Sequence, residues 1–232
     1  MWNPKDFEDR YTPKTIGDIV FPNEESKTLI EQLKSGQRPF PITEGKCGIL
    51  LYGIPGTGKS ALAKILPDAM EEVRSGNPVG NDGMYVQVQP GSNGMNLLTK
   101  IRSQAELVPV QASKHYFVLD EADNLNAQAM AVLKSVMNMP GSVFILTTNK
   151  FDQIEEGVRS RCHCIPFNAA PAQRWLPLAR RIMSDAGITG ISDQQLLAVI
   201  ATGKGSARDI TAELISIVLR VIATQSKPED RD

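Results

Sequence analysis

The sequence predicts an α/β fold in which helices cover both faces of a mostly parallel sheet of five strands, followed by a small module of three helices. Up to Phe167, short apolar segments rich in β-branched and aromatic residues alternate with helical stretches, which is the pattern of β–α–β crossovers. After Phe167 only helical patterns follow. A chain of 232 residues is long enough for one large α/β domain with such a satellite.

The five strands are predicted where apolar runs end in polar or turn residues. Their ranges are 47–53, 84–89, 115–120, 143–149 and 162–167. Between the third and the fourth strand we expect a helix around 126–138. Its apolar residues recur every three to four positions, which predicts a stripe that faces the core: Met130, Leu133, Val136 and Met137.

The last helical stretch has one apolar face, which predicts packing within a small helical module. Its members are Ile210, Leu214, Ile217, Val218 and Val221. We therefore expect an α/β domain over residues 1–167, a helical lid domain over 168–226 and a polar tail over 227–232.

Composition excludes several classes of protein. With a formal net charge of −1, no global basic field draws the chain to nucleic acid, so any such contact must be a local patch. Three cysteines do not make a disulfide framework and suit a reducing compartment. The sequence shows neither an export signal at its start nor an apolar run of about 18 residues. We expect a cytoplasmic protein with no membrane contact.

The segment GIPGTGKS, residues 53–60, fits the pattern G-x-x-x-x-G-K-[ST] between an apolar strand and a helical run. Its glycines let backbone N–H groups surround the phosphate oxygens of a nucleotide, and the N-terminus of the helix favours the negative charge. Lys59 supplies a positive charge, and Ser60 supplies a hydroxyl for Mg²⁺. The alternative is a glycine-rich turn without a ligand.

A second half of the site is predicted where the apolar strand HYFVLD is followed by a further acidic residue. Asp120 is placed to hold Mg²⁺ through water, and Glu121 can polarise an attacking water as a general base. Asn149, at the tip of the next strand beside Thr148, can orient that water or contact the γ-phosphate. Taken alone, the acidic pair fits a solvated strand end, and Asn149 fits a turn.

Six segments in this order resemble the boxes of the AAA+ ATPases, a class of P-loop NTPases, and most closely those of sliding-clamp loaders. They are RYTPKTIGDIVFPNE (10–24), GIPGTGKS, DEAD (120–123), AVLKSVMNMPGSVFILTTN (131–149), RSRC (159–162) and GSARDI (205–210). The likeness covers almost the whole chain. It implies a three-layer α/β/α fold with a lid domain and ATP and Mg²⁺ as cofactors.

The resemblance also implies roles for individual residues. The adenine pocket would be lined by Tyr11, Pro13, Ile19 and Val20, and the phosphates would be contacted by Gly53, Pro55, Gly56, Thr57, Gly58, Lys59, Ser60 and Ala61. Asn149 would be sensor 1, and Arg208 would be sensor 2, reaching the nucleotide of its own subunit. Without the resemblance, Arg208 fits a solvated charge on an amphipathic helix.

The stretch VRSRCHC, residues 158–164, fits either a metal site or a grip on phosphate. Because side chains alternate between the faces of a strand, we expect the sulfurs of Cys162 and Cys164 not to converge on one ion. A four-ligand site also lacks partners nearby, since the remaining Cys and His are Cys47 and His115. We expect the two cysteines to be small apolar fillers.

The resemblance implies that Arg161 is an arginine finger presented to the γ-phosphate of a neighbouring subunit. We place it in a polar loop before the last strand. The alternative for both arginines of this stretch, Arg159 included, is an internal salt bridge with Glu155 or Glu156. A finger in trans predicts a homo- or hetero-oligomer as the active form and slow hydrolysis by a lone subunit.

Clamp loaders continue past the lid into a collar domain, and no collar is expected here because the chain stops at Asp232. In such proteins, helices facing the central chamber follow the DNA backbone. The candidates here are Lys100, Arg102 and Lys134, which equally fit solvated helix faces. Further partners would be a sliding clamp or another DNA-bound protein.

We carry three hypotheses for function. The leading one is an ATP-hydrolysing switch or loader that acts on DNA or on a DNA-bound protein through ATP sites between subunits. The second is an ATP-dependent assembly protein, such as a filament-forming regulator of transposition or replication initiation. The third is a P-loop kinase of small molecules, against which Asp120 and Glu121 argue because a kinase needs water excluded rather than activated.

Overall fold

A computed structural model of the chain describes residues 9–42, 45–91 and 94–225. Its centre is a sheet with the strand order β2-β3-β4-β1-β5, in which every neighbouring pair is parallel. The strands are β1 (Gly48–Tyr52), β2 (Gly83–Gln87), β3 (His115–Asp120), β4 (Ser142–Thr148) and β5 (Cys162–Pro166). All five predicted strands are confirmed, with ends that differ by no more than two residues.

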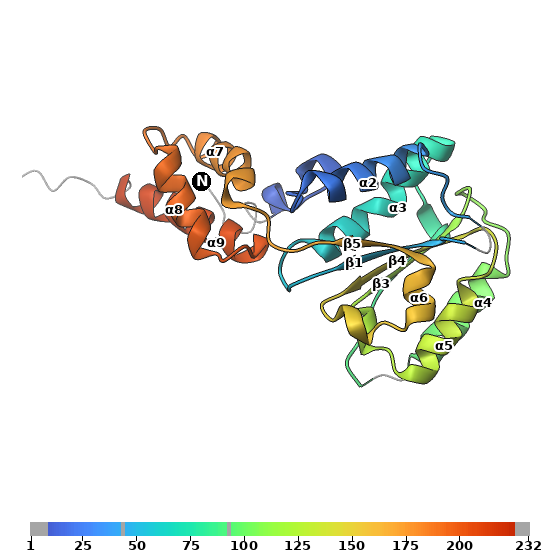
Figure 1. Cartoon of the computed structure of the whole chain (residues 1–232). Coiled ribbons are helices and arrows are strands. Elements are labelled where there is room, and N and C mark those ends of the chain that lie inside the picture. The colour runs from blue at the N-terminus through green and yellow to red at the C-terminus, as the bar shows by residue number, and fades with distance from the viewer. Residues whose placement is uncertain (1–8, 43–44, 92–93, 226–232) are drawn as a thin grey trace, which may run out of the picture.

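Helices cover both faces of the sheet (Figure 1). One face carries α2 (Glu24–Ser35) and α3 (Lys59–Ser75); the other carries α4 (Met95–Ala105), α5 (Ala127–Val136) and α6 (Glu156–Ser160). Short 3-10 helices lie at Ile16–Asp18 (η1), Gly80–Asp82 (η2), Ala122–Asn124 (η3), Phe151–Gln153 (η4) and Ala172–Trp175 (η5). The predicted three-layer α/β/α architecture is therefore confirmed.

Alternation along the central strands divides the apolar side chains between two cores. Leu50 packs toward α4 and α5, whereas Ile49 and Leu51 pack toward α2 and α3. The strands β1, β3 and β4 are buried over almost their whole length, and full burial of each large apolar side chain contributes about 1.5–3 kcal/mol. The predicted stripe on α5 is confirmed, since Met130, Leu133, Val136 and Met137 are all buried.

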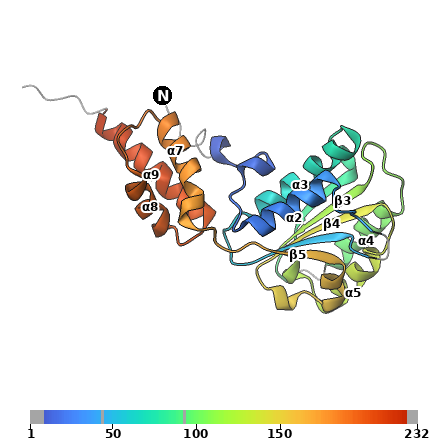
Figure 2. The same ribbon diagram turned by 45° about the horizontal axis from the view of Figure 1, so that its top comes forward.

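A third core lies in the helical module formed by α7 (Leu176–Asp185), α8 (Asp193–Thr202) and α9 (Ala207–Gln225). Figures 1 and 2 show this module beside the α/β body, joined to it by the chain that leaves β5. Phe167 belongs to the core of the body, while Ala170 already belongs to the third core. We propose on this ground that a lid domain begins directly after Phe167. The predicted tail lies outside the described residues.

The segment 106–114, between α4 and β3, has no helix or strand but is firmly held. The buried carboxylate of Asp82 accepts hydrogen bonds from the backbone N–H groups of Val110, Gln111 and Ala112. These bonds lower the pKa of Asp82 against the opposing effect of its burial. The segment thus presents three large apolar side chains to solvent in a defined arrangement: Leu107, Val108 and Val110, which are 66%, 83% and 90% exposed.

Within the described part of the chain, no helix is both long and apolar enough to cross a membrane.

Candidate nucleotide-binding site

The loop of residues 53–58 joins the end of β1 to the start of α3. Gly53, Gly56 and Gly58 adopt positive φ angles of 147°, 78° and 101°, a region that other residues rarely occupy. A Cβ atom at Gly53 would lie 2.7 Å from the carbonyl oxygen of Phe167, so the loop also needs glycine there for space. The loop leads into the N-terminus of a 17-residue helix, which is an arrangement that binds anions.

Lys59 lies buried against this loop. Its Nζ donates hydrogen bonds to the carbonyl oxygens of Gly53 at 2.9 Å and of Ile54 at 2.6 Å. Burial lowers the pKa of Lys59 to about 8, although the nearby carboxylates of Asp120 and Asp123 act in the opposite direction. The ammonium group is therefore poorly compensated, and an anion in the loop would stabilise its charged form.

Asp120, at the carboxyl end of β3, accepts hydrogen bonds from three hydroxyl groups that belong to three different elements. Oδ1 accepts from Ser60 Oγ of α3 at 2.7 Å and from Thr147 Oγ1 of β4 at 2.5 Å. Oδ2 accepts from the hydroxyl of Tyr85 in β2 at 2.7 Å. The structure thus brings together the two predicted magnesium residues, Ser60 and Asp120.

The donor set fits a magnesium ion. A hydroxyl and a carboxylate are hard oxygen donors, and Mg²⁺ is usually held by one or two carboxylates together with waters and substrate phosphates. No group of three or more His, Cys, Asp or Glu side chains able to hold a metal occurs among the residues that the structure describes. Ser60 and Asp120 are therefore the residues that would hold this ion.

Thr147 and Tyr85 were missed by the sequence analysis, which named Thr148 instead. Thr148 points to the other face of the sheet, where its Oγ1 donates to Asp123 at 2.9 Å. Side chains two residues apart on a strand share a face, so Thr147 lies on the same face as the buried Val143 and Ile145. This pattern could have identified Thr147 as a neighbour of the site. Tyr85 gave no such signal, because its contact depends on which strand pairs with β3.

A cavity of about 330 Å³ at the loop brings together three of the predicted catalytic side chains, those of Lys59, Glu121 and Asn149. Its lining includes Lys59, Ser60, Glu121, Asn149 and Arg208. Glu121 has a φ of 58°, and its backbone N–H donates to Thr147 Oγ1 at 3.0 Å. A non-glycine residue with this backbone costs on the order of 1–3 kcal/mol, and such strain is concentrated at functional sites. Asn149 and Glu121 therefore face the same space as the phosphate loop, as predicted from the strand ends.

An adjoining cavity has a volume of about 440 Å³ and is lined by residues that were predicted to contact adenine. All four predicted residues line it: Tyr11, Pro13, Ile19 and Val20. Thr57 and Gly58 of the loop and Ala61 of α3 also line it, and Arg208 lines both cavities. Trp175 of the lid module also lines the pocket and was not predicted.

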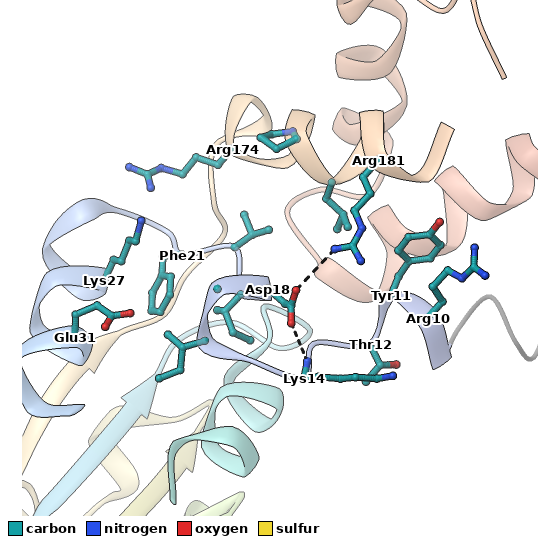
Figure 3. Close-up of a pocket in the computed structure, with 16 residues that line it drawn as sticks. Arg10, Tyr11, Thr12, Lys14, Asp18, Phe21, Lys27, Glu31, Arg174 and Arg181 are labelled. Carbon is teal, nitrogen blue, oxygen red and sulfur yellow. Dashed lines mark hydrogen bonds and ion pairs between the residues drawn. The ribbon is translucent and has the colours of Figure 1, made fainter. Parts of the chain in front are cut away.

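The helical module contacts the N-terminal segment at a neighbouring pocket, whose lining in Figure 3 includes Tyr11, Asp18 and Arg181. The hydroxyl of Tyr11 donates to Asp185 of α7 at 2.7 Å, and Arg181 of α7 points toward Asp18 at 3.8 Å. The start of α9 touches the phosphate loop directly, since the N–H of Ala207 donates to the carbonyl of Gly56 at 2.7 Å. The helical module therefore contacts both the N-terminal segment and the phosphate loop.

Arg161 lies at the opposite end of the sheet from the phosphate loop. It precedes β5, whereas the loop follows β1, and the two strands run parallel with Gly48 opposite Cys162. Four residue steps of about 3.3 Å separate these ends by roughly 13 Å along the strand. Nε of Arg161 donates to Asn138 Oδ1 at 2.8 Å, and Nη1 donates to the carbonyl of Gly157 at 2.8 Å. Arg161 is therefore remote from the phosphate loop of its own chain.

Arg161 is the single residue between α6, which ends at Ser160, and β5, where a polar loop was predicted. The alternative, a salt bridge of these arginines with Glu155 or Glu156, is not formed among the described residues. Arg159 instead approaches Asp152 at 3.9 Å and lies 4.9 Å from the ring centroid of Phe151.

The premise that the side chains of Cys162 and Cys164 point to opposite faces of the sheet is wrong. Residues two apart on a strand share a face, and both cysteines pack with Cys47 toward the core beside α5. Their interpretation as apolar fillers is correct, since Cys162 is fully buried and burial raises the pKa of its thiol well above the usual value. His163 points to the other face, where its ring packs against Phe40.

The three candidate DNA contacts differ in their surroundings. Lys100 is exposed on α4, and Arg102 on the same helix forms an ion pair with Glu106 at 3.3 Å. Lys134 was expected on an open helix face, but its ammonium group is bound to Glu155. Among the described residues, Lys100 is therefore the candidate whose charge is not shared with a carboxylate.

Comparisons with known proteins identify the family to which the chain is similar. The family model described as "ATPase family associated with various cellular activities (AAA)" matches residues 49–167. The chain is 28% identical over 204 residues to a replication factor C small subunit 2 of Pyrobaculum islandicum, covering 86% of this chain and 59% of that protein. It is 24% identical over 223 residues to DNA polymerase III subunit gamma/tau of Mycobacterium tuberculosis, covering 88% of this chain and 37% of that protein. The chain thus spans less than two thirds of the length of these relatives.

Among solved structures, the Holliday junction branch migration motor RuvB of Thermotoga maritima is similar, with a TM-score of 0.70. The match covers 93% of this chain and 67% of that one at 14% sequence identity. At this identity the likeness concerns the fold alone.

Proposed function

Because the chain belongs to the AAA family of ATPases, we propose that it is an ATP-hydrolysing molecular switch of the clamp-loader type, acting on DNA or on a DNA-bound protein. The observation that carries this proposal is the contact of Ser60 Oγ with Asp120 Oδ1 at 2.7 Å. It joins the helix of the phosphate loop to the acidic strand end beside Glu121, and this pairing serves hydrolysis as well as binding.

The adenine ring would lie between the N-terminal segment and the lid, against Tyr11 and Ile19. The phosphates would receive the N–H groups of the loop and the ammonium of Lys59. A magnesium ion held by Ser60 and Asp120 would neutralise charge on the phosphates. Glu121 would then accept a proton from the attacking water, and Asn149 would orient that water. Arg208, at the start of α9, would contact the bound nucleotide from the helical module and so link the position of this module to nucleotide binding.

We propose that Arg161 completes the site of a neighbouring subunit. This is supported by its distance from the loop of its own chain and by the two hydrogen bonds that hold its guanidinium at the start of β5. A planar, always-charged group of this kind stabilises the charge that develops on a phosphoryl group. The active form is then an oligomer with ATP sites between subunits.

The surface of α4 and the segment after it supports a role on DNA. Lys100 offers a positive charge to the phosphates of the DNA backbone. The segment 106–114 exposes Leu107, Val108 and Val110 to a protein partner. We propose that the partner is a sliding clamp. The names of the relatives, replication factor C small subunit and DNA polymerase III subunit gamma/tau, are consistent with such a setting.

The test is the ATPase rate per subunit as a function of protein concentration, with and without primed DNA. The proposal predicts that the rate rises with concentration as subunits associate, and rises further with DNA. A rate that changes with neither would contradict the switch and the inter-subunit site together.

A further inference from the structure

One carboxylate oxygen of Asp120, Oδ2, is hydrogen-bonded to a residue on an edge strand of the sheet. Oδ2 accepts a hydrogen bond from the hydroxyl of Tyr85 at 2.7 Å. Tyr85 lies in β2, an edge strand, and its backbone is opposite Val118 in the register of β2 with β3. Val118 and Asp120 share a face of β3, so the tyrosine needs only its side-chain length to reach the carboxylate.

The ring of Tyr85 is itself fixed. Lys64 of α3 lies over it, with Nζ 4.6 Å from the ring centroid, although the residue as a whole is 40% exposed. The hydroxyl donates its proton to the carboxylate of Asp120, which can only accept when it is ionised. A hydrogen bond from a neutral hydroxyl to a carboxylate is charge-assisted and orients both partners.

The role of Tyr85 follows from how hydrogen-bond donors are divided between the two carboxylate oxygens of Asp120. A carboxylate offers about four acceptor positions, of which Ser60, Thr147 and Tyr85 occupy three. A loaded site would engage the hydroxyl of Ser60 with the ion, which leaves Thr147 on Oδ1 and Tyr85 on Oδ2. With one donor on each oxygen, the carboxylate cannot rotate. With Thr147 alone, it pivots about a single contact.

We propose that Tyr85 is a positioning residue that fixes the magnesium-binding carboxylate from the edge of the sheet and thereby sets the affinity of the site for the ion. This inference rests on the proposed function, in which Asp120 and Ser60 hold Mg²⁺. Groups that orient a metal ligand through hydrogen bonds typically change metal affinity by 10–100-fold when they are removed.

The experiment is a magnesium titration of the complex with a fluorescent ADP analogue, read as equilibrium fluorescence rather than as turnover. In Tyr85→Phe, which removes only the hydroxyl, we expect the half-saturating Mg²⁺ concentration to rise on the order of 10-fold. The affinity for the analogue without Mg²⁺ should stay as in the wild type. A shared titration curve for Tyr85→Phe and the wild type would overturn the proposal.

Tyr116→Phe is the matched control, since it also removes a tyrosine hydroxyl that donates to a carboxylate, in this case Glu71 at 2.8 Å. We expect its magnesium titration to follow the wild type, and a shift equal to that of Tyr85→Phe would assign the effect to the fold and overturn the proposal. Asp120→Asn separates the two levels of inference. If Asp120→Asn loses the magnesium response while Tyr85→Phe has the same titration curve as the wild type, only the role of Tyr85 is wrong. If Asp120→Asn titrates normally, the proposed metal site is wrong as well.

Discussion

Ser60 Oγ and Asp120 Oδ1 lie 2.7 Å apart, although 60 positions separate them in the chain. The contact exists because α3 begins at the end of β1 while Asp120 ends β3, and parallel strands place their carboxyl ends at one edge of the sheet. Glu121, Asn149 and Lys59 face the same edge.

Nucleotide affinity should depend on the charge of Lys59. Its folded pKa of about 8 lies below the usual value, and a bound phosphate raises it again, so binding takes up a proton once the pH exceeds about 8. We expect the Kd for ADP to be nearly constant below pH 8 and to rise by up to about 10-fold per pH unit above it. A fluorescence titration between pH 7 and 9.5 measures this.

The control is Lys59→Arg, whose guanidinium stays charged over this range. Its affinity should show no such rise, whatever its absolute value. An equal pH dependence in both proteins would assign the proton to another group.

The same pKa shift has a consequence for stability without nucleotide. Because the pKa of Lys59 is lower in the folded than in the unfolded chain, the unfolded chain binds more protons between pH 8 and about 10.5. Its contribution to the free energy of unfolding therefore rises with pH through this window. Chemical denaturation of wild type and Lys59→Met should show the rise in the wild type only.

Glu121→Gln should bind ATP normally and turn it over about 10²–10⁴-fold more slowly, because the amide cannot accept the proton of the attacking water. Nucleotide binding and phosphate release are measured on the same sample. Glu106→Gln, on the exposed end of α4, is the matched control and should keep the wild-type rate. Normal turnover by Glu121→Gln would remove Glu121 as the base.

DNA affinity should respond to Lys100 but hardly to Lys134. Removal of one phosphate contact lowers the slope of log affinity against log salt by about 1, and Lys100→Ala should show this loss. Lys134→Ala should have little effect, because Glu155 already binds that ammonium group. Anisotropy titrations of duplex DNA at several salt concentrations compare them, and the reverse ranking would refute the assignment.

The double variant Leu107→Asp with Val110→Asp should abolish binding to a sliding clamp without changing the melting temperature. Both side chains are largely exposed, so their replacement costs little folding energy. Ser103→Asp adds a charge on exposed α4 nearby and should leave clamp binding intact. Unchanged binding by the double variant would place the partner elsewhere.

Local patterns were sufficient to predict much of this molecule. The strands are continuous apolar runs, and the phosphate loop is a contiguous motif whose glycines are required by its backbone. The adenine pocket was predicted from resemblance, and Tyr11, Pro13, Ile19 and Val20 do line one cavity. In each case the signal lies within a short stretch of sequence.

What the sequence could not supply depends on pairing between distant segments. The contact of Tyr85 with Asp120 requires the order and register of β2 and β3, which no local pattern contains. Lys134 binds Glu155 because α5 and α6 pack side by side. The error over Cys162 and Cys164 was of another kind, since strand alternation places residues two apart on the same face.

In the proposed assembly, Arg161 of one subunit completes the ATP site of another. Arg161→Ala and Glu121→Gln should each hydrolyse ATP very slowly when alone. For Arg161→Ala we expect the ATPase rate to fall by about 10³–10⁵-fold, the usual contribution of an arginine finger. In a mixture, an intact Glu121 can meet an intact Arg161 at hybrid interfaces. The ATPase rate of the two variants mixed at varying ratios is the most direct measurement. We predict a maximum at intermediate ratios well above either variant alone, whereas a rate that never exceeds the sum of the two would contradict a site shared between subunits.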